Sequence, residues 1–124
     1  MRTIFAFFAL LLASTIVSPA MTNAGGGVHY VTEVKVVNGT DRYISVDSYT
    51  HWDHTKRYGL VAPDKSVDIL YKRVKPFATD VFVYVKSKDA SETICAVMTT
   101  VGNSDHIHTE RVHFDGKRCW IVRA

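Results

Sequence analysis

The fold class follows from the stretch Val28–Tyr49, which reads VHYVTEVKVVNGTDRYISVDSY. Apolar and polar residues alternate through its first ten positions and again towards its end. A period of two residues is typical of a strand with one buried face. Between the two runs, Asn38-Gly39-Thr40-Asp41 contains residues that tolerate positive φ, and so indicates a turn. The stretch therefore predicts two strands joined by a turn.

The second of these strands has two distinct faces. Ile44 and Val46 fall on the face that we expect to be buried. Successive side chains of a strand point to opposite sides. Tyr43 and Tyr49 are therefore expected on the polar, outer face.

The same pattern, or a short apolar run, recurs along the rest of the chain. Val81–Val85 (VFVYV) is apolar on both faces and is predicted to lie centrally in a sheet. Thr50–Arg57 (THWDHTKR) is polar and predicts a loop. We expect further strands at residues 58–62, 67–71, 93–101, 106–114 and 117–123. About eight short strands with no helical period predict an all-β domain, a small antiparallel β-sandwich or a partly open barrel.

The first 24 residues are expected to be a secretory signal peptide. Arg2 precedes an unbroken apolar run, Ile4–Ala13, and small residues follow up to Ala20 and Ala24. The run is about half of the roughly 20 residues that a membrane-spanning helix needs. We expect cleavage after Ala24, with Ala20 as the alternative. The mature chain, residues 25–124, is then a single secreted or periplasmic domain without a membrane span.

Two cysteines, Cys95 and Cys119, are expected to pair, because disulfides are the default in exported domains. A loop of this length gives about 3–4 kcal/mol of stabilisation in the chain-entropy treatment.

The last two strands suggest a register. Asp115-Gly116 is the signature of a two-residue type I′ hairpin. In that register Arg111 faces Trp120, which predicts a cation–π pair on the outer face. Cys119 then points into the core.

The charge balance and the motifs limit the function classes. Lys and Arg number 15 against 12 Asp and Glu, a net charge of +3. That excess is too small and too dispersed to indicate nucleic-acid binding. The chain has no nucleophile elbow, no glycine-rich phosphate loop and no His-Glu-x-x-His motif. A non-enzymatic role is therefore expected, and a small secreted hydrolase, such as a nuclease with a histidine acid/base pair, remains an alternative.

Six histidines suggest a second alternative, a Zn or Cu site. His106, His108 and Glu110 alternate along one expected strand, which spaces them about 6.6–6.8 Å apart on one face. Two imidazoles and a carboxylate are a ligand set for such metals, and His51 and His54 could add to it. The same alternation points these three polar side chains inward. No other cofactor is expected.

Exposed aromatic and basic side chains favour binding. The candidate anchors are Tyr43, Tyr49, Trp52, Arg111 and Trp120. Tyr, Trp and Arg dominate the energetics of binding interfaces. We therefore expect the domain to bind another protein or a surface glycan outside the cell, as virulence effectors, inhibitors and immunity proteins do. Asn38-Gly39-Thr40 is also an N-glycosylation sequon.

Overall fold

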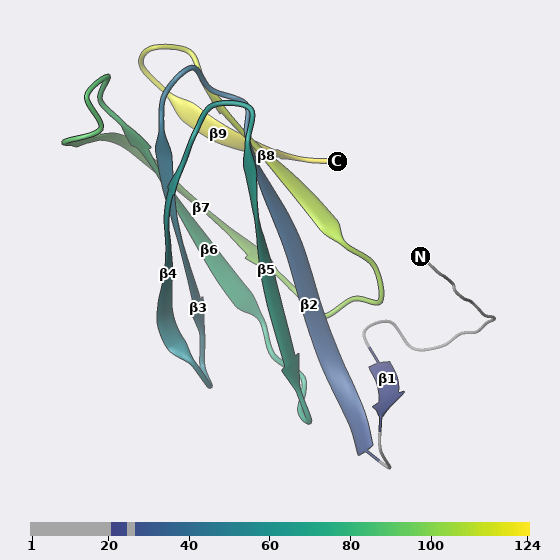
Figure 1. Cartoon of the computed structure of the whole chain (residues 1–124). Coiled ribbons are helices and arrows are strands. Elements are labelled where there is room, and N and C mark those ends of the chain that lie inside the picture. Colours follow the sequence, from purple (N-terminus) through teal and green to yellow (C-terminus); the bar gives the residue numbers. More distant parts are fainter. Residues whose placement is uncertain (1–20, 25–26) are drawn as a thin grey trace.

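Nine strands and no helix make up the described residues, 21–24 and 27–124, in the computed structural model (Figure 1). The strands are β1 (Met21–Ala24), β2 (Gly27–Asn38), β3 (Ile44–Thr50), β4 (His54–Val61), β5 (Ser66–Arg73), β6 (Thr79–Lys86), β7 (Thr93–Val101), β8 (His108–Phe114) and β9 (Cys119–Arg123). The all-β prediction is confirmed.

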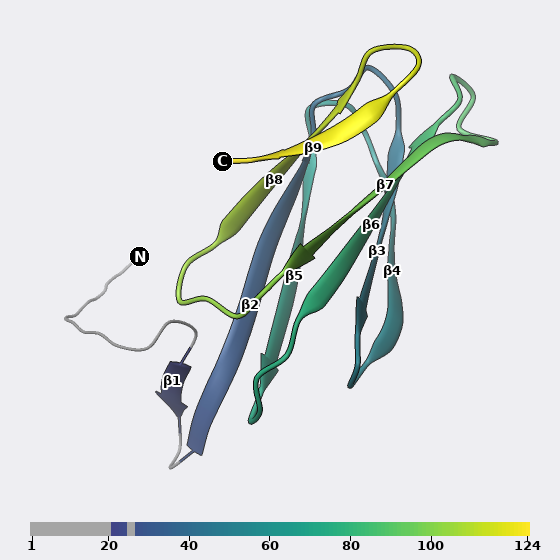
Figure 2. The ribbon, with the colours of Figure 1, turned by 180° about the vertical axis from the view of Figure 1, so that it is seen from behind.

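Two sheets face each other as a sandwich, which Figure 2 shows from behind. One sheet has the order β5-β2-β8-β9, with β1 paired to the N-terminal part of β2. The other has the order β4-β3-β6-β7. The sandwich is not wholly antiparallel, because Val34–Asn38 of β2 pairs in parallel with His108–Val112 of β8. Periodicity reports which face of a strand is buried, but not which strand lies beside it.

The core lies between the sheets and is built from alternate residues of their inner faces. Ile44 and Val46 are fully buried, whereas Tyr43 and Tyr49 are 43% and 36% exposed. The predicted faces of this strand are therefore confirmed. The buried apolar side chains are Val34, Val36, Ile44, Val46, Val61, Ile69, Tyr71, Val81, Val83, Val85, Val101 and Val112.

The predicted loop Thr50–Arg57 is wrong in its extent. Only His51–Asp53 form a turn, and β4 begins at His54. The backbone N–H of Asp53 donates to Thr50 Oγ1 at 2.9 Å, which closes the turn early. His54 then takes a positive φ of 57° and pairs with Thr50.

The predicted signal peptide lies mostly outside the described residues. Its last part, Met21–Ala24, forms β1 and pairs with Gly27–Tyr30. Among the residues that the structure describes, no helix is long and apolar enough to cross a membrane.

The predicted disulfide is confirmed. Cys95 and Cys119 are bonded, and their Cα atoms are 6.1 Å apart. Cys95 lies on β7 and Cys119 on β9, which are the edge strands of opposite sheets. The bond therefore fastens the two sheets together along one side of the sandwich.

The predicted register of the last hairpin is wrong by two residues. Phe114 pairs with Cys119, so the connection spans the four residues Asp115–Arg118. Asp115 Oδ1 accepts hydrogen bonds from the backbone N–H groups of Lys117, at 2.9 Å, and Arg118, at 2.8 Å. These bonds favour the longer turn. A shift of two residues preserves the faces, so Cys119 still points inward.

Candidate functional site

Aromatic and apolar side chains gather on the outer face of the four-stranded sheet. Tyr49 and Tyr43 reach it from β3 and its N-terminal end, Phe82 and Tyr84 from β6, and Met98 from β7. In the register, Phe82 lies directly beside Met98. We call these five residues the aromatic face.

The aromatic face is accessible to a partner. Met98 is 52% exposed, and Phe82 and Tyr84 are half-buried. The sequence-based interpretation of Val81–Val85 was right that β6 is central, since it pairs with both β3 and β7. It missed that Phe82 and Tyr84 line an exposed face. The signal was present, because the aromatic residues occupy the even positions and valines the odd ones.

The turn between β3 and β4 displays another predicted anchor, Trp52, next to this face. Trp52 is 46% exposed, and its ring meets that of His51 edge-on with centroids 5.4 Å apart. The rings of Tyr49 and His54 lie 6.1 Å apart. The structure thus gathers two predicted anchors, Tyr49 and Trp52, and two predicted metal ligands at one end of the sandwich.

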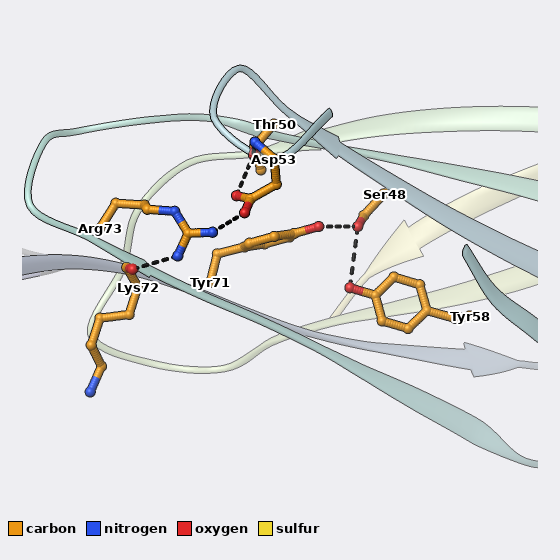
Figure 3. Close-up of polar contacts among 7 residues, drawn as sticks. All are labelled: Ser48, Thr50, Asp53, Tyr58, Tyr71, Lys72 and Arg73. Atoms are coloured by element: carbon orange, nitrogen blue, oxygen red, sulfur yellow. Dashed lines mark hydrogen bonds and ion pairs between the residues drawn. The ribbon is translucent and has the colours of Figure 1, made fainter. Parts of the chain in front are cut away.

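Asp53, the last residue of this turn, fixes it through contacts with Thr50 and Arg73 (Figure 3). Thr50 Oγ1 donates to the Asp53 carboxylate at 2.8 Å, and Arg73 of β5 forms an ion pair with it. Desolvation alone raises the pKa of Asp53, but the Thr50 hydrogen bond and the Arg73 guanidinium outweigh it, so the pKa lies below its ordinary value. The carboxylate therefore stays charged, and it ties the turn to the opposite sheet.

A second polar contact lies deeper on the same side of the sandwich (Figure 3). The Ser48 and Tyr71 hydroxyl oxygens are 2.6 Å apart, and Ser48 also donates to the Tyr58 hydroxyl at 3.2 Å. Burial raises the pKa of Tyr71, so this hydroxyl stays neutral. These hydrogen bonds join the side chains of β3, β4 and β5 on the inner side of the four-stranded sheet.

The other two anchors lie on the opposite sheet, on its outer face. The predicted Arg111–Trp120 pair is wrong, because in the observed register Trp120 faces His113 and Arg111 faces Val122. The rings of His113 and Trp120 stack with centroids 5.5 Å apart and an interplanar angle of 14°. Arg111 and Trp120 are therefore separated from the aromatic face by the whole sandwich.

The predicted metal ligands do not converge. Glu110 is 1% exposed and forms an ion pair with Arg123 of β9. His51 lies in the turn between β3 and β4, and His54 is the first residue of β4, both in the other sheet. Within residues 21–24 and 27–124, no three His, Cys, Asp or Glu side chains are grouped closely enough to hold a metal ion.

His106 and His108 do come together, with ring centroids 4.7 Å apart. Nε2 of His108 is buried and has no hydrogen-bond partner among the described residues. Burial lowers the pKa of His108, and the neighbouring His106 and Arg123 lower it further.

Ser104 and Asp105 both approach His106, but not as a catalytic triad. Ser104 Oγ lies 2.6 Å from His106 Nδ1, and Asp105 Oδ1 lies 3.4 Å from the same nitrogen. A triad needs the carboxylate and the nucleophile on different ring nitrogens. Ser104 is also only 4% exposed. The backbone N–H of His106 also donates to Ser104 Oγ at 3.2 Å, so these contacts hold the loop before β8.

Asn38, the sequon residue, has a structural role in the folded domain. Its side chain is fully buried, and Nδ2 donates to the carbonyl oxygens of Arg42, at 2.7 Å, and Val61, at 2.9 Å. A glycan on Nδ2 is incompatible with these contacts in the folded domain.

Comparison with known proteins finds no matching family model, no matching curated protein and no matching solved structure.

Proposed function

We propose that this domain is a non-enzymatic binding module that meets a partner protein or glycan outside the cell through the aromatic face. The observation that carries the proposal is the placement of Tyr43, Tyr49, Phe82, Tyr84 and Met98 on one exposed sheet surface. Exposed apolar surface of this kind marks interaction sites on small domains.

The strands that present these side chains are held in place from behind. The inner residues of β3 and β6 are fully buried, most of them valine or isoleucine with Ser48, Thr50 and Thr79 towards one end, and β6 is paired on both edges. Aromatic side chains on a rigid support lose little conformational entropy on binding, so more of their contact energy appears as affinity. The aromatic face is therefore favoured over a loop as the contact surface.

The location outside the cell is supported by two features. One is the Cys95–Cys119 disulfide, since such bonds persist in oxidising compartments. The other is the signal peptide expected from the sequence. A secreted binding module of this size fits the effector, inhibitor and immunity classes of protein.

The proposal is tested by displaying the oxidised domain to arrays of glycans and of cell-surface proteins. We expect Tyr49→Ser and Phe82→Ser to weaken binding to any positive partner by at least about tenfold. Trp120→Ser is the matched control, because Trp120 is similarly exposed but lies on the opposite sheet. Circular dichroism and thermal unfolding check that each variant folds.

Two results would overturn this function. One is a partner whose binding is unchanged by both aromatic-face substitutions but lost with Trp120→Ser. The other is turnover of RNA, DNA or cell-wall polymers by the purified domain that is abolished by His106→Ala.

A further inference from the structure

A hollow of about 370 Å³ opens on the outer face of the four-stranded sheet, beside Tyr84 of the aromatic face. Its lining residues are Ser45, Asp47, Arg57, Gly59, Tyr84, Lys86 and Thr93. Small-molecule sites have volumes of about 300–1,000 Å³, so the hollow is large enough for a single sugar ring.

The hollow exists because two neighbouring strands carry small residues there. Ser45 of β3 and Gly59 of β4 border it, and no atom lies within 4 Å of where a Cβ on Gly59 would be. The register shifts between Ser45 and Asp47, so β4 has a bulge at this point. Bulges re-aim side chains and recur next to binding sites. Gly59 has a φ of 81°, a conformation that glycine adopts without strain.

The charged side chains around the hollow do not form ion pairs with one another among the described residues. Asp47 and Arg57 are direct cross-strand partners, yet among the described residues neither side chain makes an ion pair or a hydrogen bond. Lys86 Nζ donates to Thr93 Oγ1 at 2.9 Å and keeps further donors. The lining thus offers two cations, one carboxylate, three hydroxyls and the aromatic ring of Tyr84.

We propose that this hollow binds a sugar acid, a pyranose ring that carries a carboxylate. This inference rests on the proposed binding function and names the ligand chemistry of that surface. Arg57 and Lys86 match the carboxylate of the sugar, since charge-assisted hydrogen bonds from guanidinium and ammonium groups are the strong ones. Asp47 accepts hydrogen bonds from ring hydroxyls, and Tyr84 packs against the apolar face of the ring.

Anions without hydrogen-bond donors fit less well because of Asp47. A carboxylate is acceptor-only when ionised, so its partner must bring donors. A carboxylate alone brings negative charge without donors, and Asp47 would repel it. A neutral sugar brings donors but leaves both cations without a partner. A ligand that combines a carboxylate with hydroxyls satisfies all of these groups.

The test is an NMR titration of the oxidised, isotope-labelled domain with the sodium salts of glucuronic, galacturonic and N-acetylneuraminic acid. We expect at least one of them to shift the amides of β3, β4 and β6 with a Kd of about 1 mM or below. Glucose, which lacks the carboxylate, and acetate, which lacks the sugar ring, are the controls. Both are expected to bind at least about tenfold more weakly. The three acids, run as separate arms, identify the source of the sugar acid.

Matched substitutions locate the site. Asp47→Asn and Ser45→Phe are expected to lower the affinity by at least about tenfold. Asp68→Asn and Ser66→Phe are the controls on exposed positions of β5, in the other sheet, and are expected to leave it unchanged. The absence of saturable shifts with all three acids, or equal affinity in the Asp47→Asn and Asp68→Asn variants, would overturn the inference. Loss of array binding in Tyr49→Ser alongside either result would still leave the proposed function standing.

Discussion

Glu110 on β8 and Arg123 on β9 form an ion pair in which the carboxylate is 1% exposed and the arginine side chain 45% exposed. Arg123 also reaches the other sheet, because its Nη2 donates to the carbonyl oxygen of Thr100 on β7 at 3.2 Å. The inward carboxylate that the sequence pattern placed among core residues is therefore matched by a cation. That cation also bridges the two sheets.

Replacing the cation should be costly. We expect Arg123→Met to lower the free energy of unfolding by about 1–3 kcal/mol, since it leaves a buried carboxylate without its partner. Urea denaturation measures the change. The double variant Glu110→Met with Arg123→Met should recover part of the loss, because no buried charge remains. A fully stable Arg123→Met variant would contradict this account of the pair.

The disulfide should contribute a similar amount. Replacing Cys95 and Cys119 together by alanine is expected to lower the free energy of unfolding by about 2–4 kcal/mol. The bond joins two edge strands, so its loss releases one side of the sandwich. Wild-type protein treated with dithiothreitol should behave like the double variant, and the variant should not respond to the reagent. Equal denaturation midpoints for the oxidised and reduced protein would disprove the expectation.

Asp53 should make stability fall in acid. Its pKa in the folded domain lies below the ordinary value of 3.8, so the unfolded chain binds the proton more readily. The stability that this carboxylate contributes is therefore complete above about pH 4–5 and is lost as the pH falls through 3.8 and below. Unfolding measured at neutral pH and near pH 3 should show a smaller difference in Asp53→Asn than in the wild type. Arg73→Met, which removes the partner cation, should also reduce this difference.

His108 should also make the free energy of unfolding increase with pH, but in a higher pH range than Asp53. Its folded pKa is lowered from 6.5, so protonation favours the unfolded chain. Stability is expected to rise as the pH increases from the folded pKa towards 6.5 and to level off above it. His108→Gln should flatten this part of the profile, whereas His51→Gln, a change in the exposed turn, serves as the control. A profile that is unchanged by His108→Gln would show that another group controls it.

Asn38 should be needed for the fold. Asn38→Ala removes the donors to two carbonyl oxygens and the acceptor that serves both Thr40 N and Thr40 Oγ1. Since the groups left behind are buried or half-buried, we expect a loss of about 1–3 kcal/mol in the free energy of unfolding. Thermal unfolding gives the measurement, and the exposed neighbour Asp41→Ala provides a control that should change little.

Local pattern was enough to predict the strand faces. The alternation of Ile44 and Val46 with Tyr43 and Tyr49 assigned the buried and exposed sides of β3 correctly. The disulfide followed from the cysteine count and the expectation of export. These features depend on neighbouring residues or on composition, and both can be read from one sequence.

Features that depend on side-chain hydrogen bonds or on distant strands were missed. The predicted register of the last hairpin was wrong by two residues, because the Asp115 carboxylate accepts hydrogen bonds from two backbone N–H groups and so stabilises a longer turn. The aromatic face was only partly found, because Phe82 and Tyr84 belong to a strand whose apolar pattern suggested burial on both sides. The hollow beside Asp47 depends on a bulge in the partner strand, which periodicity does not report.

The parallel pairing of β2 with β8 has a kinetic consequence. Val34 meets His108, so the first long strand cannot complete its sheet until nearly the whole polypeptide is available. Closing that large loop costs conformational entropy before the contact can stabilise the fold. Chains dominated by such non-local pairs therefore fold slowly. Renaturation on the timescale of milliseconds to seconds is expected, and a ribosome-bound chain that lacks its C-terminal segment should still be unfolded.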